Sequence, residues 1–303
     1  MWEDLLQKLQ QGDVKALARS ISFVENEQGG YSSMLQALPP NSDIKIIGIT
    51  GPPGAGKSSL VDSLIGVFVK AGKKVAVLCV DPSSPFNLGA VLGDRIRMSA
   101  WYTHPNVFIR SLATRGSLGG LHPKIIEITD LLKAFRFDYI IVETVGIGQS
   151  EIEITGLADV TVVVLVPEAG DEIQTMKAGL MEIADIFVVN KSDRPGADTF
   201  VKNLQQMLAP AFRSHYHEVP VLKTIASLQE GVVELADTIL HQLQKKQISD
   251  KKYWLLAEMA YYLIQKRRMT GIDKELLKKE IEQLSLAGTF NLYKYCKKIS
   301  GNQ

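Results

Sequence analysis

One stretch of the chain, residues 51–58, constrains the fold more than any other. It reads Gly-Pro-Pro-Gly-Ala-Gly-Lys-Ser, which fits the pattern of a glycine, four free positions and then Gly-Lys-Ser or Gly-Lys-Thr. The apolar run at 44–50 predicts a buried strand before it, and residues 59–68 predict a helix after it. In such a turn the glycines let backbone N–H groups point at an anion, and the helix N-terminus adds its positive dipole end. The context predicts a phosphate-binding loop that joins a strand to a helix.

This loop supplies the first group of expected nucleotide-binding residues. The Lys57 side chain is expected to reach the β- and γ-phosphates, and the Ser58 hydroxyl is expected to bind Mg²⁺. The residues expected to contact the phosphates are Pro53, Gly54, Ala55, Gly56, Lys57, Ser58 and Ser59.

The composition is that of an ordinary globular protein. The chain has 303 residues, of which 46% are hydrophobic and 22% are charged, so one large domain with additions, or two domains, is expected. The formal net charge of +1 does not indicate a nucleic-acid binder. The two cysteines form no disulfide framework, the apolar runs are too short to span a bilayer, and the N-terminus lacks a signal-type block. We therefore expect a cytoplasmic protein without membrane or nucleic-acid partners.

The order of predicted elements indicates an α/β fold. Strands and helices alternate from residue 44 to about 243, and several strands are continuous Val/Ile runs, which is typical of a doubly wound, mainly parallel sheet of the P-loop NTPase class. The predicted strands are 44–50, 74–80, 106–110, 138–143, 160–166, 185–190 and 219–224. The predicted helices between them are 57–71, 122–135, 172–183, 197–209 and 230–244.

Helical segments are expected on both sides of this region. The predicted domains are a helical extension at 1–40, a nucleotide-binding domain at 41–244 and a helical arm at 245–303. The arm is predicted to form helices at 250–268, 273–286 and 290–299, and it carries 13 Lys and Arg against 6 Asp and Glu. That basic balance fits either a docking surface or solvated helix faces. The apolar residues at 253–256 and 261–264 exceed one packed stripe, which suits a dimer contact.

A second motif, Asn-Lys-Ser-Asp at 190–193, follows the predicted strand 185–190 and indicates the base. The Asp193 carboxylate can accept hydrogen bonds from the ring N–H and the exocyclic amine of guanine. Adenine has no such donor pair and would leave the carboxylate unpaired, which is costly. Asn190 is expected to tie the loop together, the Lys191 stem to pack on the ring, and the backbone N–H of Ala226 to meet the guanine oxygen. These residues predict GTP rather than ATP.

Acidic residues at strand ends suggest how a metal is held. Asp81, Asp94 and Glu143, together with Ser58, are candidate Mg²⁺ ligands, although Mg²⁺ keeps several waters and not all need bind it directly. The N–H of Gly146 is expected to meet the γ-phosphate. Ile147 follows it, where Ras-like GTPases have a water-orienting glutamine. We therefore expect slow intrinsic hydrolysis that accelerates when a partner orders the site.

Together these motifs resemble those of the MeaB/ArgK GTPases, with which the mitochondrial methylmalonic aciduria type A protein belongs. The resemblance runs from the N-terminal helices to about residue 243 and is loose beyond it. The stretches that carry it are 51–58, Asp-Pro-Ser-Ser at 81–84, Leu-Gly-Asp-Arg-Ile-Arg-Met at 92–98, Glu-Thr-Val-Gly-Ile-Gly-Gln-Ser-Glu at 143–151, and 170–185. One departure is Thr224-Ile225-Ala226, where the family usually has Thr-Ser-Ala.

The resemblance implies a homodimeric GTPase chaperone with GTP or GDP and Mg²⁺ as ligands. It implies that GTP binding and hydrolysis gate the delivery of adenosylcobalamin to a cobalamin-dependent mutase, such as methylmalonyl-CoA mutase, and protect that mutase. Lys57, Asp81, Asp94 and Glu143 are implied as its catalytic residues. A switch that reports the nucleotide state is implied at Gln149, Asp171 and Lys177.

Two other functions fit a phosphate-binding loop. A GTPase that inserts a metal such as nickel typically carries His-rich or clustered Cys segments, which this chain lacks. A small-molecule kinase of the arginine type needs a second substrate pocket with an acceptor base, and no such base is identifiable in the sequence.

Overall fold

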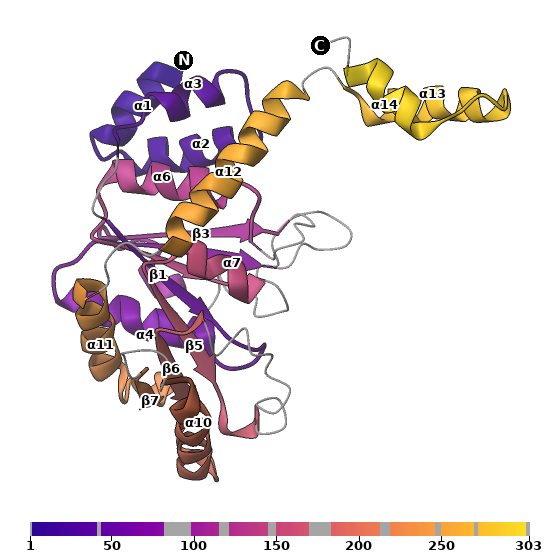
Figure 1. Cartoon of the computed structure of the whole chain (residues 1–303). Helices are drawn as coiled ribbons and strands as arrows, with labels where there is room; N and C mark the ends of the chain where they lie inside the picture. The colour runs from indigo at the N-terminus through magenta and orange to yellow at the C-terminus, as the bar shows by residue number, and fades with distance from the viewer. Residues whose placement is uncertain are drawn as a thin grey trace. The chain divides into compact units, whose positions relative to one another are not determined.

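The computed structural model describes residues 2–40, 44–81, 98–114, 121–144, 150–169, 183–212, 219–245, 250–269 and 272–300 (Figure 1). Residues 1–253 form one compact unit and residues 254–303 form a second. The domain limits expected at residues 40 and 244 stay predictions.

A seven-stranded sheet lies at the centre of the first unit, in the order β3-β2-β4-β1-β5-β6-β7. Every neighbouring pair is parallel. The strands are β1 Lys45–Thr50, β2 Val75–Asp81, β3 Val107–Ala113, β4 Tyr139–Glu143, β5 Val160–Leu165, β6 Ile186–Asn190 and β7 Val221–Thr224. Each predicted strand is present, and the predicted doubly wound parallel sheet is confirmed.

Helices cover both faces of this sheet (Figure 1). α4 (Lys57–Lys70) and α11 (Val232–Lys245) pack on one face through apolar residues such as Phe68 and Ile239. α7 (Ser150–Leu157) contacts β1 and β5, and α10 (Ala197–Phe212) packs against β5 and β6 from the opposite face. α6 (Ile125–Phe135) connects β3 to β4. The sequence analysis placed no helix at α7, and residues 172–182 of the helix expected at 172–183 lie outside the described residues.

An aspartate immediately before a strand recurs three times and sets where neighbouring strands begin. Asp159 accepts a hydrogen bond from the backbone N–H of Ile46 at 2.8 Å and donates its own N–H to the Ile46 carbonyl at 2.7 Å. Asp138 makes the same reciprocal pair with Lys74, and Asp185 makes it with Thr161. The bonds at Ile46 and Thr161 are part-buried and the one at Lys74 is exposed, and an intramolecular hydrogen bond contributes about 0.5–1.5 kcal/mol to stability. These side chains therefore stabilise the register of β2, β1 and β5 at the edge opposite the phosphate loop.

Three N-terminal helices, α1 (Trp2–Gln10), α2 (Val14–Glu25) and α3 (Tyr31–Gln36), form the predicted helical extension. α1 and α2 pack on α6, and buried residues such as Leu17 and Ile21 fill the contact. Lys124 bridges Glu27 at 3.1 Å and Glu127 at 3.0 Å. Burial by itself lowers the pKa of Lys124, but the two carboxylates outweigh it and hold that pKa above the usual lysine value. The extension is thus attached by apolar packing and by charge pairs.

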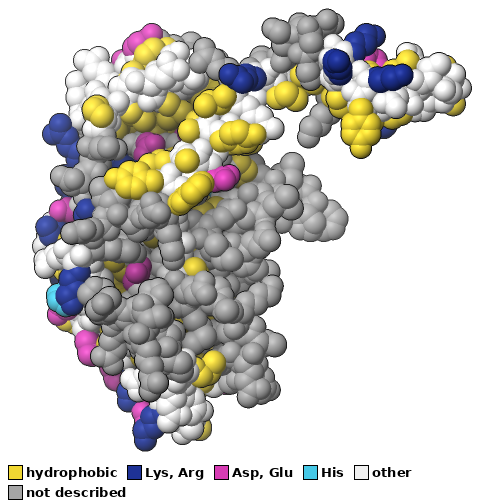
Figure 2. Space-filling model, in the orientation of Figure 1, with side chains coloured by type: hydrophobic (Ala, Val, Ile, Leu, Met, Phe, Trp, Pro, Cys, Tyr) yellow, Lys and Arg dark blue, Asp and Glu magenta, His cyan; other side chains and the backbone are white. Residues whose placement is uncertain are grey.

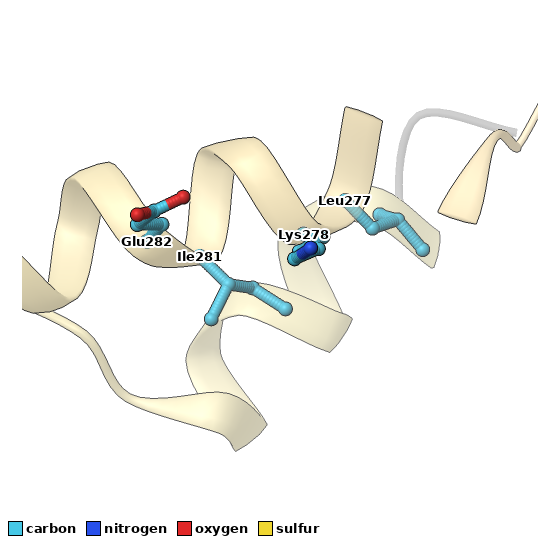
Figure 3. Close-up of a pocket in the computed structure, with 4 residues that line it drawn as sticks. All are labelled: Leu277, Lys278, Ile281 and Glu282. Atoms are coloured by element: carbon cyan, nitrogen blue, oxygen red, sulfur yellow. The ribbon is translucent and has the colours of Figure 1, made fainter. Parts of the chain in front are cut away.

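The second unit contains most of α12 (Asp250–Arg268), with α13 (Lys274–Leu286) and α14 (Leu292–Ser300). The Tyr295 hydroxyl of α14 donates to Glu280 of α13 at 2.7 Å, and this bond raises the pKa of Tyr295 to about 12. A hollow of about 550 Å³ lies along α13 and is lined by Leu277, Lys278, Ile281 and Glu282 (Figure 3). None of the helices that the structure describes is long and apolar enough to cross a membrane.

Candidate functional site

The sheet order brings the sequence motifs to one edge. In a parallel sheet all carboxyl ends meet at the same edge, where ligands bind. The phosphate loop follows β1, Glu143 ends β4, Asn190 ends β6, and Ala226 follows β7. β5 lies between β1 and β6. A nucleotide with its phosphates at the β1 loop and its base at the β6 and β7 loops therefore has to cross the end of β5.

Two glycines of the phosphate loop are required by its close contacts. Gly51 has φ of 139°, and a Cβ there would stand 2.0 Å from the carbonyl oxygen of Val164 in β5. Gly56 has φ of 86°, and a Cβ there would stand 2.4 Å from the Nδ2 atom of Asn190. Any other residue at these positions would clash and adopt strained backbone. The phosphate loop thus packs directly against β5 and against the loop at 190–196, which carries the Asn-Lys-Ser-Asp motif and is called the base-recognition loop below.

Lys57 lies in the first turn of α4, and its ammonium group bonds to the loop itself. Its Nζ atom donates to the carbonyl oxygens of Gly51 at 2.8 Å and Pro52 at 3.1 Å. The side chain is buried, with a relative exposure of 7%. Because a buried ammonium needs polar partners, these carbonyls hold the charge at the loop. When a nucleotide binds in the loop, its charged phosphate oxygens would replace these neutral carbonyl oxygens as hydrogen-bond acceptors for Lys57.

Ser58 and Glu143, both candidate metal ligands, are in direct contact. The Ser58 hydroxyl donates to the Oε1 atom of Glu143 at 2.7 Å, and both residues are buried. Asp81 is also buried and ends β2, two residues beyond Cys79, which pairs with Glu143 in the sheet. Nearby, the Thr144 hydroxyl donates to that of Thr50 at 2.8 Å. The structure thus places carboxylate and hydroxyl oxygen atoms at the ends of β2 and β4 and at the start of α4.

Asn190 joins the loops that follow β1, β6 and β7. Its Nδ2 atom donates to the Ala55 carbonyl at 2.9 Å, and its Oδ1 atom accepts from the Thr224 hydroxyl and the Ala226 N–H, each at 3.1 Å. The expectation that Asn190 ties the loop together agrees with this geometry. The Ala226 N–H, expected to meet the guanine oxygen, already donates to Asn190, so a guanine oxygen would have to share or replace that bond.

The rest of the base-recognition motif lies beside the phosphate loop. Lys191 has φ of 55°, in the left-handed region, and its Nζ atom donates to the Gly54 carbonyl at 2.8 Å. Asp193 is exposed. Arg194 pairs with Glu168, which lies just beyond β5 in the short 3-10 turn η2 (Pro167–Ala169). Sequence reasoning did not identify this pair, because its residues are 26 positions apart and no motif contains both.

Several predicted residues fall outside the described part of the chain. These are Asp94, Gly146, Ile147, Gln149, Asp171 and Lys177. Met98, the last residue of the motif at 92–98, is described and is fully buried. Trp101 follows in the 3-10 turn η1 (Ser99–Trp101), and its Nε1 atom donates to Asp62 of α4 at 2.7 Å.

A family model described as methylmalonyl Co-A mutase-associated GTPase MeaB matches residues 17–259. The chain belongs to the MeaB family of GTPases. A putative GTPase of Pyrococcus abyssi is 48% identical over 243 residues, which cover 79% of this chain and 75% of the relative. A fused isobutyryl-CoA mutase of Geobacillus kaustophilus is 38% identical over 238 residues, which cover 74% of this chain and 22% of that protein.

Solved structures agree with the fold of this MeaB-family GTPase. The structure of a LAO/AO transport system kinase superposes with a TM-score of 0.64 at 24% sequence identity, covering 99% of this chain and 96% of that one. At this identity the likeness shows the P-loop fold. The predicted membership of the MeaB/ArgK family and the predicted GTPase activity are confirmed, and nucleotide binding follows from the family.

Proposed function

We propose that this GTPase is a chaperone that gates the delivery of adenosylcobalamin to a cobalamin-dependent mutase, such as methylmalonyl-CoA mutase, and protects that mutase. The observation that carries the proposal is the mutase link in the family. The family model is described as mutase-associated, and one relative carries a domain like this chain within a fused isobutyryl-CoA mutase. A GTPase domain fused to a mutase supports a working contact between the two activities.

In this proposal GTP lies across the edge of the sheet that carries the motifs. Lys57 binds the β- and γ-phosphates, the phosphate loop from Pro53 to Ser59 surrounds them, and Gly146 meets the γ-phosphate. Asn190, Lys191, Asp193 and Ala226 hold guanine. The bonds from Asn190 to Ala55 and from Lys191 to Gly54 support this assignment, because they join the phosphate loop to the loop that is proposed to bind the base.

Mg²⁺ fits the oxygen atoms gathered beside the phosphate loop. Ser58, Asp81 and Glu143 offer a hydroxyl and two carboxylates, which are the ligands that Mg²⁺ prefers, and Asp94 is proposed to join them. When bound, Mg²⁺ neutralises charge that develops on the phosphates. Ser58 would bind the ion through a lone pair of its Oγ atom while its O–H donates to Glu143.

We also propose that the protein is a homodimer formed through its C-terminal arm. Apolar side chains are exposed along α12 (Figure 2), among them Trp254 at 67% and Tyr261 at 68% relative exposure. Exposed aromatic patches of this kind mark interaction sites. Sedimentation velocity at micromolar concentration is expected to give twice the mass of one chain. A wild-type protein that is monomeric at that concentration would contradict the proposal. The double variant Trp254→Glu with Tyr261→Glu is expected to be monomeric, because it places charges in the exposed apolar surface.

The nucleotide state is proposed to reach the mutase through the segment that contains Gln149, Asp171 and Lys177. The position of a water-orienting glutamine holds Ile147, so we propose that the mutase supplies or orders the missing group. GTP turnover then has to depend on the mutase. The experiment that tests the proposed function is therefore GTP turnover with and without the mutase, and stimulation is the expected result.

A further inference from the structure

The base-recognition loop at 190–196 is held by hydrogen bonds to two neighbouring parts of the fold. Asn190 bonds to Ala55, Lys191 bonds to Gly54, and the Ser192 N–H donates to the Thr224 carbonyl at 3.1 Å. These contacts fasten the loop to the loop after β1 and to β7. They also hold Lys191 in a left-handed conformation, which a lysine rarely adopts without support.

One further contact fastens the loop to β5. The Arg194 guanidinium donates to the Oε1 atom of Glu168, which lies three residues beyond the end of β5. β5 separates β1 from β6 in the sheet, so Glu168 follows the strand that a bound nucleotide has to cross. Asp193 therefore lies between two fastened residues, because Ser192 before it bonds to Thr224 and Arg194 after it pairs with Glu168.

Charge supports the same arrangement. The hydrogen bond from Arg194 lowers the pKa of Glu168, and the positive charges of Arg194 and Lys191 lower it further. The Glu168 carboxylate thus pairs with Arg194 and is also favoured by the charge of Lys191, and these two cations flank Asp193 in the sequence. Without Glu168, Arg194 would lose its carboxylate partner beyond the end of β5.

We infer that Glu168, through its ion pair with Arg194, is a positioning residue that holds the Asp193 carboxylate in place for the guanine base. The inference rests on the proposed guanine site. Two hydrogen bonds from guanine to one carboxylate need the loop at a fixed position, and a loop ordered in advance loses less entropy on binding. Glu168 acts on the nucleotide through Arg194 and Asp193 and does not contact the reacting phosphate.

The test measures the dissociation constant of GDP by calorimetry for the full-length protein. Glu168→Gln removes the ion pair and keeps the side-chain size, and Arg194→Gln removes it with a shorter polar side chain. Each is expected to raise the GDP dissociation constant by about two- to fivefold, the range of an exposed ion pair, and to leave the turnover number at saturating GTP unchanged. Asp198→Asn is the matched control, because Asp198 forms an exposed ion pair with Lys223 at 2.9 Å outside the base-recognition loop. It is expected to leave GDP binding unchanged.

Exchanging the two charged residues distinguishes a loss of GDP affinity caused by the missing ion pair from a loss caused by general damage to the structure. The double variant Glu168→Arg with Arg194→Glu restores an ion pair of opposite direction and is expected to recover most of the lost affinity. Wild-type affinity in both single variants, or a swap that binds GDP no better than the singles, would overturn the inference. A wild-type protein that binds ADP as tightly as GDP would instead overturn the proposed guanine site, so the two failures are distinguishable.

Discussion

Replacing Lys57 with alanine is expected to lower GTP turnover by at least about a hundredfold, the scale seen when one charge-stabilising group is removed from a transition state. The ammonium lies at the start of α4 and bonds to the carbonyls of Gly51 and Pro52, so it already points into the phosphate loop. Alanine leaves no cation there to offset charge on the β- and γ-phosphates. Phosphate release under saturating GTP measures the effect.

Lys70→Ala is the matched control for this variant. Lys70 ends the same helix and is exposed, so its removal is expected to leave turnover unchanged. Circular dichroism of both variants checks that α4 and the sheet stay folded. A Lys57→Ala protein that hydrolyses GTP at the wild-type rate would rule out the phosphate-binding role of Lys57.

Asp193→Asn is expected to change the preferred base from guanine to xanthine. The carboxylate accepts from the ring N–H and the exocyclic amine of guanine, whereas xanthine carries an oxygen where guanine has the amine. An asparagine amide can donate to that oxygen. Binding of GDP is expected to weaken by about ten- to a hundredfold, as for a lost hydrogen bond to a charged group, while binding of XDP strengthens.

Calorimetry with GDP, XDP and ADP measures this change in preference. Asp237→Asn, at an exposed position of α11, makes the same chemical change away from the site and is expected to alter none of the three affinities. Unaltered preference for GDP over XDP in Asp193→Asn would exclude base reading by Asp193.

The strands and the phosphate loop were predictable because their signals are local. Short runs rich in β-branched residues, such as Val160–Leu165, favour a strand covered on both faces. The eight-residue helix α7 was missed because Glu151, Ile152, Glu153 and Ile154 alternate charged and apolar residues, a period that also suits a strand. An eight-residue helix also spans too few turns for the 3.6-residue spacing of its apolar residues to be recognised in the sequence.

Contacts between distant parts of the chain were beyond the reach of the sequence. Asn190 was predicted to tie the loop together, but its partner Ala55 is 135 residues away and follows from the sheet order. The pair of Glu168 and Arg194 was missed because it depends on β5 and β6 being neighbours. The hydrogen bond from the Ala226 N–H to Asn190 was likewise unpredictable, since it depends on the side-chain orientation of Asn190.

The measurement that tests the account most directly is GTP turnover by the full-length protein alone and with a cobalamin-dependent mutase, beginning with methylmalonyl-CoA mutase in its apo form. The account predicts a slow rate for the isolated protein, because Ile147 occupies the position of a water-orienting glutamine. It predicts a rate that rises with mutase concentration and saturates. The Lys57→Ala protein with the mutase is the control for contaminating hydrolysis. Fast turnover without the mutase, or a rate unaffected by any candidate cobalamin mutase, would contradict the account.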